Sequence, residues 1–187
     1  IFTEGITKIT TIDIKYAKAM NKKIKLLASC KREGDKLCAI VAPCLVSPEH
    51  PLYSVDDVFN AIFVKGNMLG DSMFYGSGAG KLPTASAVVG DVVEAAKNPG
   101  RSMMSTWSDE KLELIGKSET KKRFFVRVNA KKEELLSKVQ EVFGEIEVVT
   151  LEGEESEFGF VTEVMSEGAF DMCAAKCPEI CHMIRVE

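Results

Sequence analysis

The segment Phe74-Tyr75-Gly76-Ser77-Gly78-Ala79-Gly80-Lys81-Leu82-Pro83-Thr84 decides how the first half of the chain is interpreted. Its three alternating glycines lie between an apolar run typical of a strand and a helix expected to begin at Pro83 and end near Lys97. Glycine permits positive φ angles and lets another molecule approach the backbone closely. A helix N-terminus adds free N–H groups that favour an anion. The segment therefore predicts either a cofactor contact or a tight turn packed by small residues.

Two nucleotide-binding motifs do not match this segment. A P-loop ending at Gly80-Lys81 needs a glycine and a hydroxyl where the chain has Tyr75 and Leu82. A Gly-x-Gly-x-x-Gly fingerprint needs its third glycine where the chain has Lys81 or Pro83. The pattern by itself leaves ligand contact and simple packing open.

Upstream of the glycines, the apolar pattern predicts a helix and several strands. Thr10 or Thr11 is a suitable N-cap for a helix over residues 12–21. The stretch around Gly34-Asp35 is expected to join two strands through a loop longer than two residues. Pro43 cannot donate a ladder hydrogen bond, so we place it at an edge or a bulge. Strands are expected over residues 24–28, 37–46, 61–64 and 73–75.

Downstream, a polar stretch over residues 98–121 separates the first part from a more regular one, and Trp107 is expected to anchor this linker by packing. Residues 122–187 then predict the order β-α-β-β-α-β of a ferredoxin-like unit, with Gly144 ending one helix and Ser166 capping the other. We therefore expect an α+β protein. A mixed sheet with helices on one face is expected over residues 1–97, and a small ferredoxin-like domain over residues 122–187.

Composition excludes several classes of protein. The chain has 24 Lys and Arg against 28 Asp and Glu, which disfavours nucleic acid as a partner. No apolar run reaches the roughly 18–20 residues that span a bilayer. The chain begins at Ile1 instead of Met, and we expect it to be a piece of a longer protein.

The six cysteines are expected to be reduced thiols in the cytoplasm. Cys173, Cys177 and Cys181-His182 have a spacing that could suggest a metal, but Pro178 interrupts the segment and zinc sites use closer pairs. We predict no metal site.

The string GAGKLPTASAVVGD, from Gly78 to Asp91, resembles the signature near the end of the homoserine dehydrogenase catalytic domain. The resemblance is collinear over residues 1–97, which is more specific than one motif. It also includes Thr3-Glu4-Gly5-Ile6, Lys23-Ile24-Lys25-Leu26-Leu27-Ala28, Pro43-Cys44-Leu45-Val46 and His50-Pro51-Leu52.

The resemblance implies an NADP- or NAD-dependent oxidoreductase that interconverts aspartate 4-semialdehyde and L-homoserine, on the route to threonine and methionine. It implies that Gly80 approaches the cofactor, with Gly78 as a neighbouring candidate, and that the protein is a homodimer. The family's catalytic lysine and nucleotide-binding fingerprint lie upstream of the segment matching Glu4 and have no counterpart here. We therefore assign no catalytic residue and expect the chain alone to be inactive.

Residues 122–187 resemble an ACT domain, which in many enzymes of amino-acid metabolism binds an effector amino acid. The family's first loop carries a turn of the Asp-x-Pro-Gly type, but here the stretch is Asn129-Ala130-Lys131-Lys132. Threonine binding and a purely structural or dimerising role both stay open. The alternative to an enzyme fragment is a stand-alone amino-acid-sensing module without catalysis, which would not need the resemblance over residues 1–97.

Overall fold

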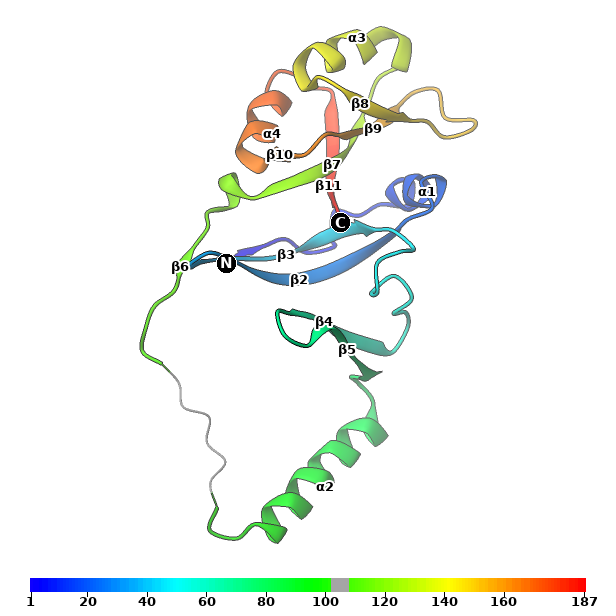
Figure 1. The fold of residues 1–187 in the computed structure, drawn as a ribbon. Helices are drawn as coiled ribbons and strands as arrows, with labels where there is room; N and C mark the ends of the chain where they lie inside the picture. The colour runs from blue at the N-terminus through cyan, green and yellow to red at the C-terminus, as the bar shows by residue number, and fades with distance from the viewer. Residues whose placement is uncertain (102–107) are drawn as a thin grey trace. The chain divides into compact units, whose positions relative to one another are not determined.

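The computed structural model describes residues 1–101 and 108–187, so Trp107 lies outside the described residues. The chain forms two compact units, one of residues 1–50 with 112–187 and one of residues 51–111 (Figure 1). We refer to them as the first and the second unit. The domain boundaries expected at residues 97 and 122 stay a prediction.

The first unit is built around a mixed sheet with the path β1-β3-β11-β7-β9-β8. β2 and β6 also pair with β3, and β10 pairs with β7. β1, β6 and β11 run parallel to β3, and the remaining pairings are antiparallel. The predicted α+β class with a mixed sheet is therefore confirmed. The strands are β1 (Phe2–Thr3), β2 (Lys23–Glu33), β3 (Lys36–Val46), β6 (Glu113–Leu114), β7 (Lys121–Val128), β8 (Ile146–Val149), β9 (Phe158–Thr162), β10 (Met165–Ser166) and β11 (Ile180–Val186).

The predicted order β-α-β-β-α-β is present after η1 (Lys117–Glu119), with α3 (Lys132–Phe143) and α4 (Glu167–Ala174) as its helices. The two-residue strand β10 is an addition to the predicted order. Gly144 ends α3 at a φ of 77°, and the Ser166 hydroxyl accepts a hydrogen bond from the Ala169 N–H at 3.1 Å. Both helix signals in the sequence are therefore confirmed.

The sheet continues from the N-terminal strands into this β-α-β-β-α-β region. β11 pairs with β7 on one side and lies parallel to β3 on the other, with Arg185 opposite Cys44 and Val186 opposite Leu45. The polar stretch before residue 122 also contributes β6 and η1 to the first unit. The C-terminal strand β11 thus pairs with a strand that lies more than half of the chain length before it in the sequence.

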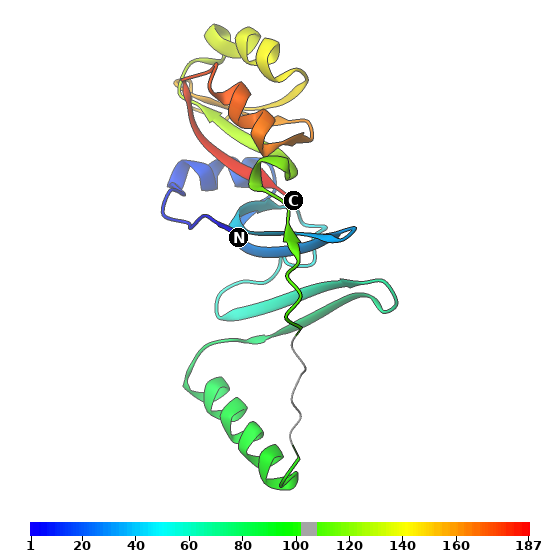
Figure 2. The same ribbon diagram turned by 90° about the vertical axis from the view of Figure 1, so that its left-hand side faces the viewer.

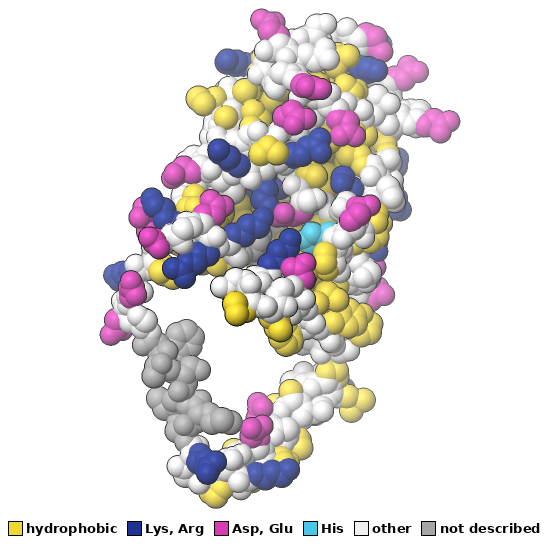
Figure 3. All heavy atoms as spheres, viewed as in Figure 1, with side chains coloured by type: hydrophobic (Ala, Val, Ile, Leu, Met, Phe, Trp, Pro, Cys, Tyr) yellow, Lys and Arg dark blue, Asp and Glu magenta, His cyan; other side chains and the backbone are white. Residues whose placement is uncertain are grey.

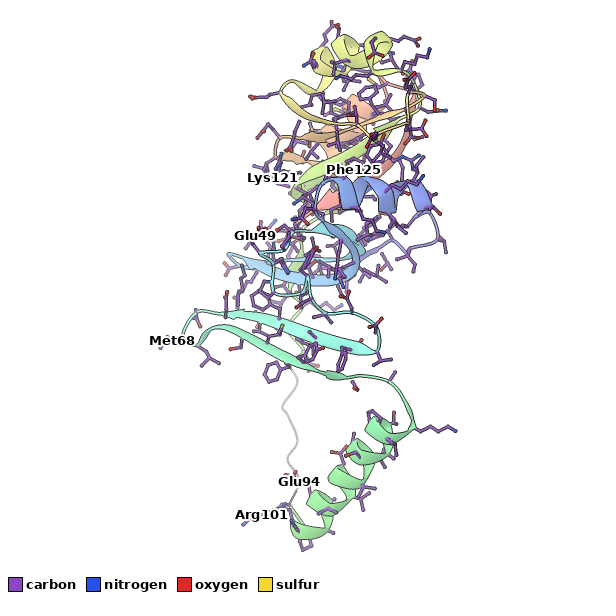
Figure 4. All side chains as sticks on the ribbon, turned by 90° about the vertical axis from the view of Figure 1, so that its right-hand side faces the viewer. Glu49, Met68, Glu94, Arg101, Lys121 and Phe125 are labelled. Atoms are coloured by element: carbon purple, nitrogen blue, oxygen red, sulfur yellow. The ribbon has the colours of Figure 1, made fainter. Side chains whose placement is uncertain are left out.

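Helices cover both faces of this sheet (Figures 1 and 2). Phe124 and Val126 of β7 belong to a core that includes Phe143 of α3 and Phe170 of α4. Phe125 belongs to a second core with Tyr16 of α1 (Thr11–Ala19), and Figure 4 labels it where α1 lies against the sheet. The helices on the other face, α3 and α4, come from the β-α-β-β-α-β region, which the expectation of helices on one face over residues 1–97 did not include. Since successive side chains of a strand point to opposite faces, the consecutive apolar residues Phe124, Phe125 and Val126 of β7 need cover on both.

The β2–β3 hairpin has a tighter turn than expected. Glu33 pairs with Lys36, which leaves only Gly34 and Asp35 in the loop. Gly34 has a φ of 63°, a backbone angle that glycine adopts without a steric penalty. The prediction of a longer loop was wrong because the strands extend beyond the apolar runs into the charged residues next to the turn.

Pro43 lies inside β3, opposite Leu26 of β2, and not at an edge. On the other side of β3, β1 pairs with residues up to Val41 and β11 pairs from Cys44 onward. The carbonyls of Val41 and Leu45 accept hydrogen bonds from that side. Because residues alternate along a strand, the nitrogen of Pro43 faces the same side, where one strand ends and the next begins. The missing N–H therefore leaves no ladder partner unpaired.

The second unit contains the hairpin of β4 (Phe59–Gly66) and β5 (Gly70–Ser77), followed by α2 (Lys81–Lys97). None of its described residues is buried. Figure 3 shows hydrophobic side chains on the surface of this hairpin and of α2, and Met68 lies at the tip of the hairpin in Figure 4. Among the described residues, no helix is both long and apolar enough to cross a membrane.

Candidate functional site

The glycine turn between β5 and α2 has the backbone geometry that the sequence suggested. Gly80 is the N-cap of α2 with a φ of 113° and a ψ of 157°, a conformation that strongly favours glycine. Its carbonyl accepts a hydrogen bond from the Thr84 N–H at 3.2 Å. Pro83 is the third residue of α2 and not the first, a position where a missing N–H still costs no intrahelical bond. The turn is exposed, so its backbone is accessible to a ligand.

Gly78 has a different role in the geometry. A Cβ atom at this position would overlap the Asn60 side chain of β4, with Cγ only 2.8 Å away. The absence of a side chain at Gly78 is therefore explained by packing of the turn against the hairpin. The structure thus shows packing at Gly78 and an exposed backbone at Gly80, and cofactor contact stays a prediction.

Sequence reasoning missed a buried ion network at the N-terminus of α1. Arg127 of β7 donates from Nε and Nη2 to the two carboxylate oxygens of Glu157 at 3.2 and 2.7 Å. Its Nη1 donates to Asp13 Oδ1 at 2.9 Å and to Thr10 Oγ1 at 3.2 Å. The ring of His182 on β11 contributes Nδ1 at 2.9 Å from the same Asp13 oxygen. Asp13 is fully buried, and Arg127 and Glu157 are nearly so.

The sequence signal for this network was the helix cap alone. Asp13 Oδ2 accepts from the Thr10 N–H and hydroxyl, each at 2.7 Å, which completes a capping box. Burial disfavours the Asp13 carboxylate, but hydrogen bonds from His182, Thr10 and Arg127 outweigh it and lower its pKa. Burial likewise opposes the charge of Arg127, and its bonds to Glu157 and Asp13 more than offset this, so its pKa is raised. Both groups therefore stay charged in the folded protein.

A second buried arginine joins other parts of the first unit. Arg185 of β11 is 1% exposed and donates from Nε and Nη2 to Glu167 of α4 at 2.7 and 2.8 Å. Its Nη1 donates to Glu4, just after β1, at 2.7 Å. The guanidinium lies 5.1 Å from the centre of the Phe2 ring. Each of the two arginines therefore holds one carboxylate from residues 1–19 and one from the C-terminal region.

A cavity of about 540 Å³ lies next to the first network. It is lined by the N-terminal end of α3 at Lys131 and Lys132 and by the acidic loop between β8 and β9, which includes Glu157. The other residues that line the cavity are Glu133, Thr150, Leu151, Gly153, Glu154 and Glu155. Glu157 therefore contacts Arg127 while forming part of the cavity wall.

The cysteine-rich end of the chain has no metal-binding geometry. Cys177 is buried, Cys173 is partly buried, and Cys181 donates its thiol to the Arg127 carbonyl at 3.5 Å. Within residues 1–101 and 108–187, no group of three or more His, Cys, Asp or Glu could hold a metal ion.

Comparison with known proteins assigns the chain to a family. A sequence model described as homoserine dehydrogenase matches residues 1–93. Homoserine dehydrogenase of Mycobacterium leprae is 39% identical over 181 residues, covering 91% of this chain and 38% of that protein. The crystal structure of a homoserine dehydrogenase from Thiobacillus denitrificans superimposes with a TM-score of 0.81 at 25% identity, covering 98% of this chain and 47% of that one.

The chain belongs to the homoserine dehydrogenase family. The resemblance drawn from the glycine segment and its collinear neighbours is thereby confirmed, and the family is one of NAD(P)-dependent oxidoreductases. Homoserine dehydrogenase of Bacillus subtilis is 36% identical over 148 residues, which are 76% of this chain and 34% of that protein. The chain thus spans 34% to 38% of the length of these curated relatives.

Proposed function

We propose that these residues are part of an NAD(P)-dependent homoserine dehydrogenase, which interconverts aspartate 4-semialdehyde and L-homoserine. The observation that carries this proposal is the family match over residues 1–93, which contains the strained, exposed turn at Gly80. When bound, the nicotinamide cofactor supplies the hydride chemistry, and the protein contributes binding and orientation.

The residues around Gly80 fit a role beside a negatively charged dinucleotide. The positive φ places a residue without a side chain at the start of a 17-residue helix. The first turn of α2 contains no acidic residue, so no carboxylate there opposes an anion. Asn60 crowds the space beside Gly78, which makes Gly80 the better candidate for cofactor contact. The sequence does not separate NADP from NAD.

The Gly80 assignment is tested by Gly80→Ala in the full-length dehydrogenase. A methyl group there would either distort the turn or obstruct the cofactor, so we expect KM for the nucleotide to rise about tenfold, equivalent to about 1.4 kcal/mol. Gly90→Ala is a matched control, because Gly90 lies in the same helix with no atom within 4 Å of an added Cβ. An unchanged nucleotide KM in Gly80→Ala would contradict the assignment.

The activity itself is tested by steady-state assay of homoserine oxidation with NADP and with NAD. We expect turnover from a chain that includes the upstream catalytic and nucleotide-binding regions of the family, and none from residues 1–187 alone. Turnover by these 187 residues, or no turnover by the longer chain, would refute the proposal.

We also propose that the second unit helps to form a homodimer. Ile62, Phe74 and Tyr75 of the β4–β5 hairpin are 67%, 67% and 51% exposed. Among the described residues, these two strands pair only with each other, which leaves edges that another chain could join. Phe74→Glu should shift the full-length protein toward monomer in sedimentation experiments. Met172→Glu in α4, at an equally exposed hydrophobic position, should leave the dimer intact.

We propose that the β-α-β-β-α-β region is an ACT-type regulatory unit, with threonine as the effector amino acid to be tested. The cavity between Lys131 and the acidic loop offers groups of both charges, as a zwitterion requires. Calorimetry with threonine and with NADP tests this proposal. Threonine binding without any dinucleotide effect would favour the stand-alone sensing module, and no threonine binding would favour a structural role.

We place the protein in the cytoplasm, where the six free thiols would stay reduced.

A further inference from the structure

The network around Arg127 connects two segments that are distant in sequence and have different environments. One is the acidic loop that ends at Glu157, immediately before β9. The other is the N-terminal turn of α1, where Asp13 accepts hydrogen bonds from both groups of Thr10. Arg127 contacts both segments directly, through Nε and Nη2 on one side and Nη1 on the other.

The chemistry of the three buried charges makes their positions interdependent. With both carboxylates in place, Arg127 has a negative partner on each side, and Glu157 receives two parallel N–H bonds. If Glu157 moved away, Arg127 would keep Asp13 as its partner but would have unpaired N–H groups in a nearly dry site. The guanidinium would then have to rotate or admit water, and either change alters its bond to the helix cap.

We propose that Arg127 is a positioning residue that couples the acidic loop of residues 152–157 to the N-terminal cap of α1. A displacement of the loop changes the position of the Glu157 carboxylate. Arg127 then changes its orientation, and this alters the hydrogen bonds that hold Asp13. His182 contacts Asp13 from β11 and keeps the carboxylate partly fixed, so the coupling acts chiefly on the first turn of the helix.

The position of α1 gives this coupling a consequence for the rest of the protein. The helix follows the segment that contains Glu4, which Arg185 holds against α4. Tyr16 and Ala17 of α1 also pack on the sheet face opposite to α3 and α4. A signal from the cavity wall would therefore reach the strand-to-helix connection at residues 4–10 without crossing the second unit. A regulatory role for this coupling rests on the proposed function, whereas the coupling between the loop and α1 does not.

Hydrogen exchange of the full chain tests the coupling directly. In Glu157→Gln the side chain keeps its size but loses its charge. We expect hydrogen exchange of the backbone amides in the N-terminal turn of α1 to accelerate about tenfold. Asp13→Asn should accelerate the same amides. Glu155→Gln, in the same loop and the same cavity wall but exposed, should leave α1 unchanged.

Two further variants separate coupling from a purely structural role. Arg127→Lys keeps the charge but cannot bond both carboxylates bidentately, so α1 exchange should lie between wild type and Glu157→Gln. Adding Glu157→Gln to Arg127→Met should accelerate α1 exchange no further than Arg127→Met alone. Unchanged α1 exchange in Glu157→Gln, or equal acceleration of β7, β9 and α1, would overturn the proposal. Since these readouts need no turnover, a failed dehydrogenase assay would leave them intact.

Discussion

The guanidinium of Arg127 and the carboxylate of Asp13 meet at 2.9 Å, although 114 residues separate them in the sequence. Arg127 belongs to β7, and Asp13 lies in the first turn of α1. The same arginine holds Glu157 through two further bonds. This contact ties the N-terminal helix to the sheet of the β-α-β-β-α-β region, and its removal is the most direct test of how that region is attached.

Arg127→Met should destabilise the protein by about 3–5 kcal/mol, because it leaves two buried carboxylates without their shared cation. Denaturant unfolding of the full chain measures the change. Arg123→Met is the control on the same strand, since Arg123 pairs with Glu147 at 3.3 Å with 38% and 67% of the two side chains exposed. Its Nε also donates to the Thr162 carbonyl at 3.0 Å, a bond that leaves no buried carboxylate unpaired when it is lost. An exposed pair of this kind contributes about 0–1 kcal/mol, so a similar loss in both variants would contradict the structure.

The stability should depend on the charge of Asp13 in acid. Since its folded pKa lies below its ordinary value of 3.8, its stabilising contribution is fully present well above pH 3.8. As the pH falls through this value the unfolded chain takes up the proton first, and the contribution is progressively lost. Thermal unfolding from pH 7 to pH 2.5 should therefore show a shrinking difference between wild type and Asp13→Asn. A difference that stays constant or grows in acid would be inconsistent with an ionised, buried Asp13.

Arg185→Met should be as damaging as the change at Arg127, because Glu167 is 1% exposed and would lose both of its bonds to the guanidinium. We expect a loss of about 3–5 kcal/mol in denaturant unfolding. Within the described part of the chain, Glu167 would keep only its ion pair with Lys117 Nζ at 3.4 Å. The double variant Arg185→Met with Glu167→Leu should recover part of the loss, since it also removes this poorly paired buried carboxylate. A double variant less stable than the sum of the two single changes would argue against a mutually dependent pair.

Gly159→Ala should destabilise the sheet by about 1–3 kcal/mol through overpacking. An added Cβ would lie 2.6 Å from Phe125 Cε2 and 3.1 Å from Tyr16 Cε1, where α1 covers the sheet. Gly5→Ala is a suitable control, because no atom lies within 4 Å of an added Cβ there. Thermal denaturation compares the two, and the opposite ranking would mean that α1 does not pack against β9.

The cysteines should differ sharply in reactivity. Burial raises the pKa of the Cys44 thiol to about 11, and the neighbouring Glu187 carboxylate acts in the same direction. Cys30 is exposed. Iodoacetamide at pH 8, followed by mass spectrometry, should label Cys30 while Cys44 reacts only after denaturation, because the thiolate is the nucleophile. Early labelling of Cys44 in the native protein would mean that β3 is accessible to reagent.

The local signals in the sequence were sufficient for most elements of the first unit. Ser166 and Gly144 act within one turn of their own helices, so their roles could be inferred without tertiary information. The positive φ of Gly80 is likewise a local property that alternating glycines suggested, whereas its contact with a cofactor stays a prediction. The tight turn at Gly34 was missed because charged residues near a hairpin tip carry no apolar alternation.

The sequence by itself determined the order of the longer helices and strands and, through the glycine segment and its collinear neighbours, the family. The two-residue strands β1, β6 and β10 and the short helix η1 were not predicted. Only the tertiary structure decided that β11 joins β3, that α1 covers the second face of the sheet, and that Arg127 and Arg185 each link the two ends of the chain. The physical reason is that periodicity reports which face of an element is buried. It carries no information about which distant strand, helix or carboxylate does the burying.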